Sequence, residues 1–456
     1  MKITVLGGSP KGETSVTMQY VKFLANQFPQ QEFSVVQVAQ PIKKLEENSE
    51  AFQHVVDHVC GSDGVLWAFP LYVFLVCSQY KRFIELIWEK HAAFAFKGKY
   101  AASLSTSIHF FDHTAHNYVR AVSEDLGMSF VGSHSCGMHD LLRKEGQGRL
   151  LQFAKGFFTA MEEGVQMPRV FRPIHWPGLE YMPSKEEKPK LSTPKKIVLL
   201  TDTLEGNTGK MIERFRKRFR SQVEVINLSS IDIKGGCLGC LRCADKNECV
   251  YLEKDEYIGM YNSKLKTAEI LVFEGSIRDR YLSSRWKMFF DRAFFNTHQR
   301  SLEHKQFGFL ISGPLSQAAD LREILTAFVE WQGSNLVDIV SDESMTSGEL
   351  DAAIDGLAVR LVQSAAMGYV RPVSFLGVGG MKIFRDDIKG GLRVVFRADH
   401  KSYRKSGMYD FPQNKPLKNL LFSILYLVTG IPWVKKRMIR NFKEFMITPF
   451  RKIVNA

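Results

Sequence analysis

Two segments of this chain, one opening at Lys2 and the other at Lys196, repeat the same order of features. The first reads KITVLGGSPKGETSVTM and the second KIVLLTDTLEGNTGKMI. Each begins as a continuous aliphatic and β-branched run, typical of a strand buried on both faces, and passes through a loop rich in Gly, Ser and Thr into a helix start. A chain of 456 residues is also too long for one ordinary core. The sequence therefore predicts two domains built on one plan.

Later segments recur in the same order in both halves. Runs typical of buried strands begin at Gly64 and Lys99 in the first half, and at Glu269 and Lys305 in the second. Strands that alternate with helix-length segments predict an α/β fold with a doubly wound parallel sheet in each half. We expect domains at residues 1–180 (the first half) and 197–370 (the second half), a Pro-, Lys- and Glu-rich linker at 181–196, and a basic, partly apolar helical extension at 371–456.

Each half carries a candidate phosphate loop, at residues 7–15 (the first phosphate loop) and 201–209 (the second). Ligands of such sheets bind beyond the carboxyl ends of the strands. Both loops offer backbone N–H groups and hydroxyls ahead of a helix, which suits a phosphate. Neither has the G-x-G-x-x-G or G-x-x-x-x-G-K-[ST] pattern, which weakens the dinucleotide and nucleoside-triphosphate interpretations. A polar turn with a helix cap is the alternative for either loop alone.

The first half resembles the flavodoxin-like NAD(P)H-dependent FMN oxidoreductases. The resemblance lies in the first phosphate loop, in FPLY at residues 69–72 and in the following Lys81. It implies a flavodoxin-like fold, bound FMN, NAD(P)H as electron donor and an oxidoreductase activity. The expected FMN contacts are Ser9, Pro10, Thr14 and Ser15 in the phosphate loop, Pro70, Leu71 and Tyr72 at the flavin ring, and Ser105 in the strand that follows.

The second half resembles the flavodoxins in TLEGNTG, residues 203–209. The expected cofactor contacts there are Thr203, Glu205, Gly206, Asn207, Thr208, Gly275 and Ser276. Where the first half has FPLY, this half has EGSI followed by Arg278 and Arg280, so it offers no aromatic ring for a flavin. The two arginines could hold the phosphate of NADPH or another anion, although a solvated charged loop is the commoner explanation. Whether both halves bind FMN therefore stays open.

Four of the seven cysteines lie between residues 237 and 249, the cysteine loop: Cys237, Cys240, Cys243 and Cys249. Zinc sites usually pair two C-x2-C knuckles across a longer spacer, whereas four closely spaced thiolates are the ligand set of a [4Fe–4S] cluster. A zinc-stapled or buried loop is the alternative. The loop is similar to the compact motif of the iron–sulfur flavoproteins, a branch of the same family, which implies a cluster within electron-transfer reach of FMN. The other three cysteines, Cys60, Cys77 and Cys136, fit buried apolar positions better than ligand positions.

Five histidines lie in two short segments of the first half, residues 109–116 and 134–140. A metal site there is conceivable, because His109, His113 and His116 would share one face of a helix. Segments after the fourth strand form the rim of the flavin pocket in the family that the chain resembles, and we favour that interpretation.

These features predict a flavin-dependent oxidoreductase that passes electrons between NAD(P)H, FMN and a [4Fe–4S] cluster to an acceptor that the sequence does not identify. A quinone, ferredoxin or a small molecule would each fit. The alternative is a zinc-stapled flavodoxin-like scaffold without redox turnover, slightly favoured by the altered segment 274–280. The repeated plan also suits a homodimer or a pseudo-dimer within one chain. We assign no catalytic acid or base.

Charge and hydropathy set expectations for location and partners. The formal net charge is +13, and Lys and Arg are dense after Arg371. This favours an anionic partner for the C-terminal end, with no nucleic acid expected.

The opening run lacks the features of a signal peptide, which favours a reducing, cytoplasmic location. The apolar run 420–434 is shorter than the ~20 residues of a spanning helix. It predicts either a peripheral segment at the inner face of the membrane, with Lys435, Lys436, Arg437, Arg440 and Lys443 beside it, or a helix packed on the second half.

Overall fold

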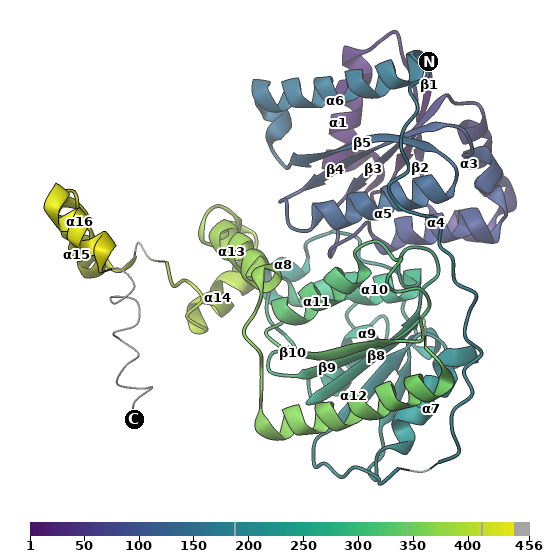
Figure 1. Ribbon diagram of the computed structural model, residues 1–456. Coiled ribbons are helices and arrows are strands. Elements are labelled where there is room, and N and C mark those ends of the chain that lie inside the picture. The colour runs from purple at the N-terminus through teal and green to yellow at the C-terminus, as the bar shows by residue number, and fades with distance from the viewer. Residues whose placement is uncertain (187, 344, 412–413, 442–456) are drawn as a thin grey trace. The chain divides into compact units, whose positions relative to one another are not determined.

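The computed structural model of the protein describes residues 1–441 except 187, 344 and 412–413 (Figure 1). The chain divides into two compact units, the first of which is Met1–His400 and the second of which begins at Lys401. The first unit contains both halves together. The domain limits proposed at residues 180, 196 and 370 therefore remain predictions.

The first unit contains two five-stranded parallel sheets with the same strand order. The first sheet has the order β2-β1-β3-β4-β5 and the second, read in the same direction, has the order β7-β6-β8-β9-β10. The strands are β1 (Lys2–Gly7), β2 (Glu32–Gln37), β3 (Gly64–Pro70), β4 (Tyr100–Ser107), β5 (Ser129–Gly137), β6 (Ile197–Thr201), β7 (Glu224–Asn227), β8 (Ile270–Ser276), β9 (Gln306–Ser312) and β10 (Asn335–Ser341). The central strands are almost wholly buried, as their aliphatic sequences require. The predicted α/β fold class is confirmed.

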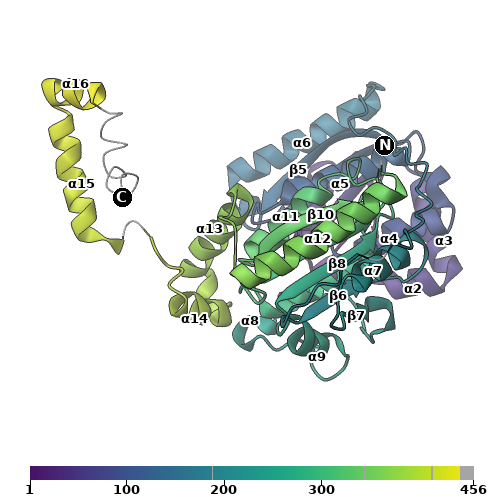
Figure 2. The same cartoon turned by 60° about the horizontal axis from the view of Figure 1, so that its bottom comes forward.

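Helices cover both faces of each sheet (Figures 1 and 2). In the first half they are α1 (Val16–Gln27), α2 (Ile42–Glu47), α3 (Ser49–Cys60), α4 (Ser78–Glu89), α5 (Asp112–Asp125) and α6 (Lys144–Glu162). In the second half they are α7 (Gly206–Lys217), α8 (Cys243–Lys246), α9 (Tyr257–Met260), α10 (Ser284–Arg292), α11 (Leu321–Trp331) and α12 (Ser347–Met367). The chain continues through α13 (Phe375–Lys389), α14 (Arg397–Lys405), α15 (Pro416–Thr429) and α16 (Pro432–Arg440), which form the predicted helical C-terminal region.

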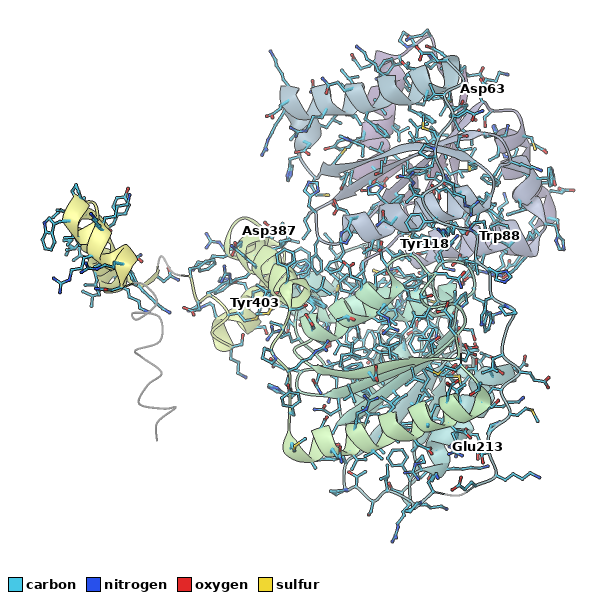
Figure 3. All side chains as sticks on the ribbon, in the orientation of Figure 1. Asp63, Trp88, Tyr118, Glu213, Asp387 and Tyr403 are labelled. Atoms are coloured by element: carbon cyan, nitrogen blue, oxygen red, sulfur yellow. The ribbon has the colours of Figure 1, made fainter. Side chains whose placement is uncertain are left out.

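The inner faces of the two halves share one apolar core. Side chains of α1 and α6 pack on the outer face of the first sheet, and those of α7 and α12 on the outer face of the second. A third cluster extends across both halves and includes Phe83, Tyr118, Phe289 and Phe328. Figure 3 shows Tyr118 at this boundary, where its hydroxyl donates a hydrogen bond to Asp279 at 2.9 Å. The two sheets are therefore joined through α4, α5, α10 and α11.

Helices α4 and α10 meet in a reciprocal arrangement. The backbone N–H of Ser78, at the start of α4, donates to the Asp291 carboxylate at 2.7 Å, and the N–H of Ser284, at the start of α10, donates to Glu85 at 2.6 Å. Within the helices, Lys81 pairs with Glu85 at 2.8 Å and Lys287 pairs with Asp291. Each helix thus caps the other's N-terminus with a carboxylate near its own C-terminus. This is the pattern of an isologous interface, formed here within one chain.

Candidate functional site

The predicted flavin-ring residues form a tight turn after β3, residues 69–75, which we call the flavin turn. Its backbone is fixed by hydrogen bonds from the Leu71 N–H to the Thr106 carbonyl at 3.1 Å and from the Tyr72 N–H to the Leu75 carbonyl at 2.8 Å. Pro70, Leu71 and Tyr72 are half-buried. Phe74 has a φ of 64°, a conformation that bulky residues rarely adopt and that clusters at binding sites. The turn is therefore a rigid platform at the carboxyl edge of the first sheet.

The first phosphate loop is a compact, helix-capping turn. Ser9 is buried and its Oγ accepts a hydrogen bond from the Lys11 N–H at 3.2 Å. Ser15 caps α1 through the Met18 N–H at 3.3 Å, whereas Thr14 is exposed and donates to the Lys11 carbonyl. Pro10 lies half-buried between them. The loop has the cap that the simpler interpretation predicts, and phosphate binding by it remains a prediction.

Ser105 belongs to a buried polar network at the end of β4. Its hydroxyl contacts His116 Nε2 at 2.9 Å and Ser135 at 3.3 Å, while Ser103 contacts the other ring nitrogen of His116 at 2.7 Å. Burial lowers the pKa of His116 to about 4, so the ring is neutral at pH 7. The two strand hydroxyls thereby fix the His116 ring beside the predicted flavin edge.

His109, His113 and His134 each have partners of their own. His109 contacts Asp112 at 3.0 Å, and His113 contacts Glu323 of the second half at 3.0 Å. His134 stacks on Phe153. Among the described residues, no group of three or more His, Cys, Asp and Glu side chains has the geometry of a metal site. The described side chains thus give the histidine-metal interpretation no support.

In the second phosphate loop, the predicted contact residues bond mainly to their neighbours. The Asn207 amide donates to Asp342 at 2.9 Å and to the Leu179 carbonyl, and Thr208 shares a hydrogen bond with Ser276 at 3.0 Å. The hydroxyls of Thr201 and Thr203 accept from backbone N–H groups of Thr203 and Glu205. Gly206, with a φ of 58°, opens α7.

The second half keeps the backbone of the flavin turn without its aromatic ring. Arg278 N–H donates to the Tyr281 carbonyl at 3.0 Å, matching the Tyr72 to Leu75 bond of the first half. A β-carbon added at Gly275 would lie 2.6 Å from Trp286 Nε1, so the indole covers this glycine. Arg280 is buried and binds Asp125 of the first half through both oxygens, at 2.6 and 2.7 Å. The arginine that the sequence placed on a solvated loop, or on an anion, instead joins the two halves.

Three carboxyl groups gather at the ligand-binding edge of the second sheet. Glu274 is fully buried, and one of its oxygens accepts from Thr201 at 2.6 Å while the other has no partner in the described structure. Burial raises the pKa of Glu274 to about 8, and the nearby Asp202 and Asp342 add to the rise. The strand registers place Gly8, Ala68 and Cys136 of the first half at the positions of Asp202, Glu274 and Asp342. These three positions therefore hold carboxyl groups in the second half and uncharged residues in the first, which disfavours a phosphate in the second.

We predict that Glu274→Gln stabilises the protein increasingly as the pH rises. The folded-state pKa of about 8 lies above the unfolded value of 4.5. Between these two pH values only the folded state keeps the proton, so the free energy of unfolding falls as the pH rises from about 4.5 to about 8. The amide has no such titration. At about 1.4 kcal/mol per pKa unit, we expect a gain on the order of 2–4 kcal/mol at pH 9 relative to pH 5. Urea unfolding of both proteins at pH 5, 7 and 9 measures it, and a pH-independent difference would contradict it.

The four cysteines of the cysteine loop line one small cavity, together with Tyr251, Arg292 and Phe294. All seven cysteines of the chain are free thiols. Burial raises the pKa of the Cys237 and Cys243 thiols to about 12. Leu241 and Gly239 both have a positive φ, at 58° and 62°, which turns the backbone sharply between the cysteines. Of the other cysteines, Cys77 and Cys136 are buried as predicted, whereas Cys60 is exposed.

The cysteine loop of the second half packs on the flavin turn and the first phosphate loop of the first half. A β-carbon at Gly239 would overlap the Tyr72 hydroxyl and lie 3.2 Å from the Lys11 side chain. The Gln79 amide donates to the Cys237 carbonyl at 3.1 Å. Burial raises the pKa of Tyr72, and the neighbouring Cys237 adds to the rise. The resemblance implied a cluster within electron-transfer reach of FMN, but the contact between Gly239 and Tyr72 was not predicted from the sequence.

Comparison with known proteins relates the first half to a flavin-dependent family. The model of the NADPH-dependent FMN reductase family matches residues 1–140, which contain all five strands of the first sheet. The first half is therefore similar to an NADPH-dependent FMN reductase domain, and the match supports a flavin-dependent NAD(P)H oxidoreductase function. No curated protein matches the chain.

Solved structures give more distant likenesses. The chain is similar to the apo form of the NADH:FMN oxidoreductase EMOB at 19% identity, with 35% of this chain and 89% of that chain covered and a TM-score of 0.30. It is similar to FerB, a flavoenzyme NAD(P)H:(acceptor) oxidoreductase from Paracoccus denitrificans, at 18% identity, with 36% and 97% covered and a TM-score of 0.29. Neither likeness is close enough to assign an activity.

Proposed function

We propose that this protein is a flavin-dependent NAD(P)H oxidoreductase that binds FMN in its first half and a [4Fe–4S] cluster on Cys237, Cys240, Cys243 and Cys249. The observation that carries the proposal is the packing of Gly239, between two of these cysteines, on Tyr72 of the flavin turn. A cluster on this loop would lie beside the flavin ring. The two centres would then exchange electrons directly.

The first half suits FMN better than the second half does. Ser9, Pro10, Thr14 and Ser15 would hold the phosphate at the N-terminus of α1, and the edge beneath them carries no acid at Gly8, Ala68 and Cys136. Pro70, Leu71 and Tyr72 would orient the ring, with Ser105 behind it. The acidic edge of the second half argues against a second FMN on Thr203, Glu205, Gly206, Asn207, Thr208, Gly275 and Ser276. We therefore expect one FMN per chain.

When bound, FMN takes up a hydride from NAD(P)H and releases the electrons one at a time. The residues of this chain position the reaction rather than transfer protons in it. The cysteine loop packs against the Tyr72 hydroxyl of the flavin turn through Gly239. His116 is neutral and, tied to Ser103 and Ser105, keeps the β4 edge rigid.

The donor set of the cysteine loop fits an iron–sulfur cluster. Cys237, Cys240, Cys243 and Cys249 line one cavity, and the Gly239 N–H points at the Cys237 sulfur at 3.5 Å, the kind of contact that tunes a cluster. Burial raises the pKa of the Cys237 and Cys243 thiols, so a bound cation would have to displace their protons. The described side chains do not form a coordinating group by themselves, so the loop would close around the cluster as it assembles.

We also propose that the two halves arose by tandem duplication and pair as a pseudo-dimer. Ser78, Lys81 and Glu85 precede Ser284, Lys287 and Asp291 by the same number of residues, and both sets make reciprocal contacts. The flavin turn and its counterpart also keep the same backbone bonds. The second half has thus retained the interface while exchanging its flavin edge for carboxyl groups and a cysteine loop.

The experiment that tests the function is the visible spectrum of protein purified without oxygen, with flavin, iron and zinc measured per chain. We expect paired flavin bands over a broad iron–sulfur absorption, and bleaching of both by NADH or NADPH. A colourless protein that contains zinc would support the scaffold alternative instead. The acceptor stays open among a quinone, ferredoxin and a small molecule, and turnover with each distinguishes them.

We predict that Tyr72→Ala weakens FMN binding about tenfold, because a stacked aromatic ring contributes about 0.5–1.5 kcal/mol beyond its buried area. Tyr72→Phe keeps the ring and should bind FMN like the parent. Tyr100→Ala is the matched control, since Tyr100 begins β4 at the opposite edge of the sheet and bonds to Val165. Flavin fluorescence titration of the apoprotein measures the affinities. Parental affinity in Tyr72→Ala would place the flavin elsewhere.

A further inference from the structure

Helix α15 presents apolar side chains on every side. None of its residues is buried. Its exposed apolar residues are Leu417, Leu420, Leu421, Phe422, Ile424, Leu425, Tyr426, Leu427 and Val428. A helix that is apolar all round is normally covered by a protein core or by lipid. We therefore expect protein or lipid to cover the apolar surface of α15.

The dimensions of α15 suit the surface of a bilayer. Its 14 residues extend about 21 Å, against the ~30 Å thickness of the hydrocarbon core. Among the described residues, no helix combines the length and the apolar character needed to cross a membrane. The helix is long enough to lie within one leaflet.

Basic residues lie at both ends of the apolar helix. Lys418 lies near its start, and Lys415, which precedes it, pairs with Asp410 at 2.9 Å. After the end of α15, α16 brings Lys435, Lys436, Arg437 and Arg440. Trp433, a residue type of membrane interfaces, is 67% exposed in the first turn of α16. The sequence from residue 411 to 441 contains no Asp or Glu. Lys443, which belongs to the same basic stretch of sequence, lies outside the described residues.

A bend places the basic helix next to the apolar one. Helix α15 ends at Thr429, Gly430 donates to the carbonyls of Tyr426 and Leu427, and Pro432 opens α16. Figure 2 shows the two helices meeting at an angle there. The apolar surface and the cluster of cations are thus adjacent parts of one helix pair.

We propose that α15 and α16 dock the protein on an anionic lipid surface. The apolar side chains of α15 enter the acyl boundary, Trp433 lies at the headgroup level, and the cations of α16 contact the lipid phosphates. Neither the apolar insertion nor the charge alone suffices for stable attachment. The docking does not depend on the redox function.

The test is sedimentation of the full-length protein with vesicles at low salt. We expect binding to phosphatidylcholine vesicles that contain phosphatidylglycerol, little binding to phosphatidylcholine alone, and release by high salt. Lys435→Glu, Lys436→Glu and Arg437→Glu combined should weaken binding by roughly a hundredfold or more. Leu421→Asp with Leu425→Asp should abolish it.

Matched changes elsewhere in the chain provide the control. Lys185→Glu, Lys188→Glu and Lys190→Glu combined alter the net charge by the same amount on the exposed linker, and this variant should bind like the parent. If the control variant loses vesicle binding to the same extent, the binding depends on overall charge alone, and the proposal is overturned. Absence of binding to anionic vesicles by the parent would also overturn it.

Two other occupants give distinct results. If a second copy of the chain covers α15, the parent is a dimer by light scattering and Leu421→Asp with Leu425→Asp makes it monomeric. If α15 packs on the protein's own fold, the same variant lowers the unfolding temperature by several degrees. Either result overturns lipid docking, whereas a parent-like mass and unfolding temperature with lost vesicle binding supports it.

Discussion

Replacing Cys240 with serine should reduce the iron of the proposed [4Fe–4S] cluster from about four atoms per chain to nearly none while leaving the FMN content unchanged. The cysteine loop supplies the four thiols that a [4Fe–4S] cluster requires, so the loss of one opens the site. Cys240 is exposed and contributes little to the core. The proposed FMN contacts lie in the first half. Iron, acid-labile sulfide and flavin should be measured on protein purified without oxygen.

Cys60→Ser is the matched control, because Cys60 is also an exposed thiol but lies at the end of α3 in the first half. It should keep both iron and flavin. Parental iron in Cys240→Ser would disprove the cluster assignment. Loss of zinc instead of iron would identify the loop as a zinc staple.

The sheets could be predicted because their strands are continuous apolar runs, and a strand buried on both faces requires such a run. The interior of β4 shows the limit of that pattern. Ser103 and Ser105 are fully buried there, and their hydroxyls are satisfied by His116, which comes from the following helix. Hydropathy alone does not indicate that partner, since it depends on how α5 packs.

Residues that join the two halves were the least predictable. Lys81 follows the flavin turn in sequence, yet it is fully buried in ion pairs with Glu85 at 2.8 Å and Asp279 at 3.1 Å. Arg280 likewise binds the Asp125 carboxylate rather than the anion of a ligand. The sequence shows that these residues are charged, but Asp279 and Asp125 each lie in the opposite half of the chain from the residue that they bind, so these two pairs follow from the packing of the halves.

The cysteine loop was predictable in part. Its spacing identified four thiols on one short segment, and the structure places all four on one cavity. Its contact with Tyr72 joins residues that are far apart in sequence and depends on the absence of a side chain at Gly239. Local chemistry could thus be predicted, whereas the relation of this loop to the flavin turn required the tertiary structure.

The contact between α4 and α10 gives the second large prediction. Asp291→Ala should lower the free energy of unfolding by about 3–5 kcal/mol. Asp291 and Lys287 are both fully buried and paired, and Asp291 also accepts the N–H of Ser78 at the start of α4. Removing the carboxylate leaves a buried ammonium without a partner, which costs far more than the pair itself contributes. Urea unfolding of the full-length protein measures the loss.

The counterpart change Glu85→Ala should cost less, although the two halves form reciprocal contacts. In Glu85→Ala, Lys81 keeps a second carboxylate partner, Asp279. Among the described residues, Lys287 forms its ion pair with Asp291. Glu145→Ala, which breaks an exposed pair with Arg149, should change the free energy by no more than about 0.5 kcal/mol. Combining Lys287→Met with Asp291→Leu should recover part of the loss, because it removes both buried charges. A single Asp291→Ala variant as stable as Glu145→Ala would mean that the reciprocal caps do not hold the two halves together.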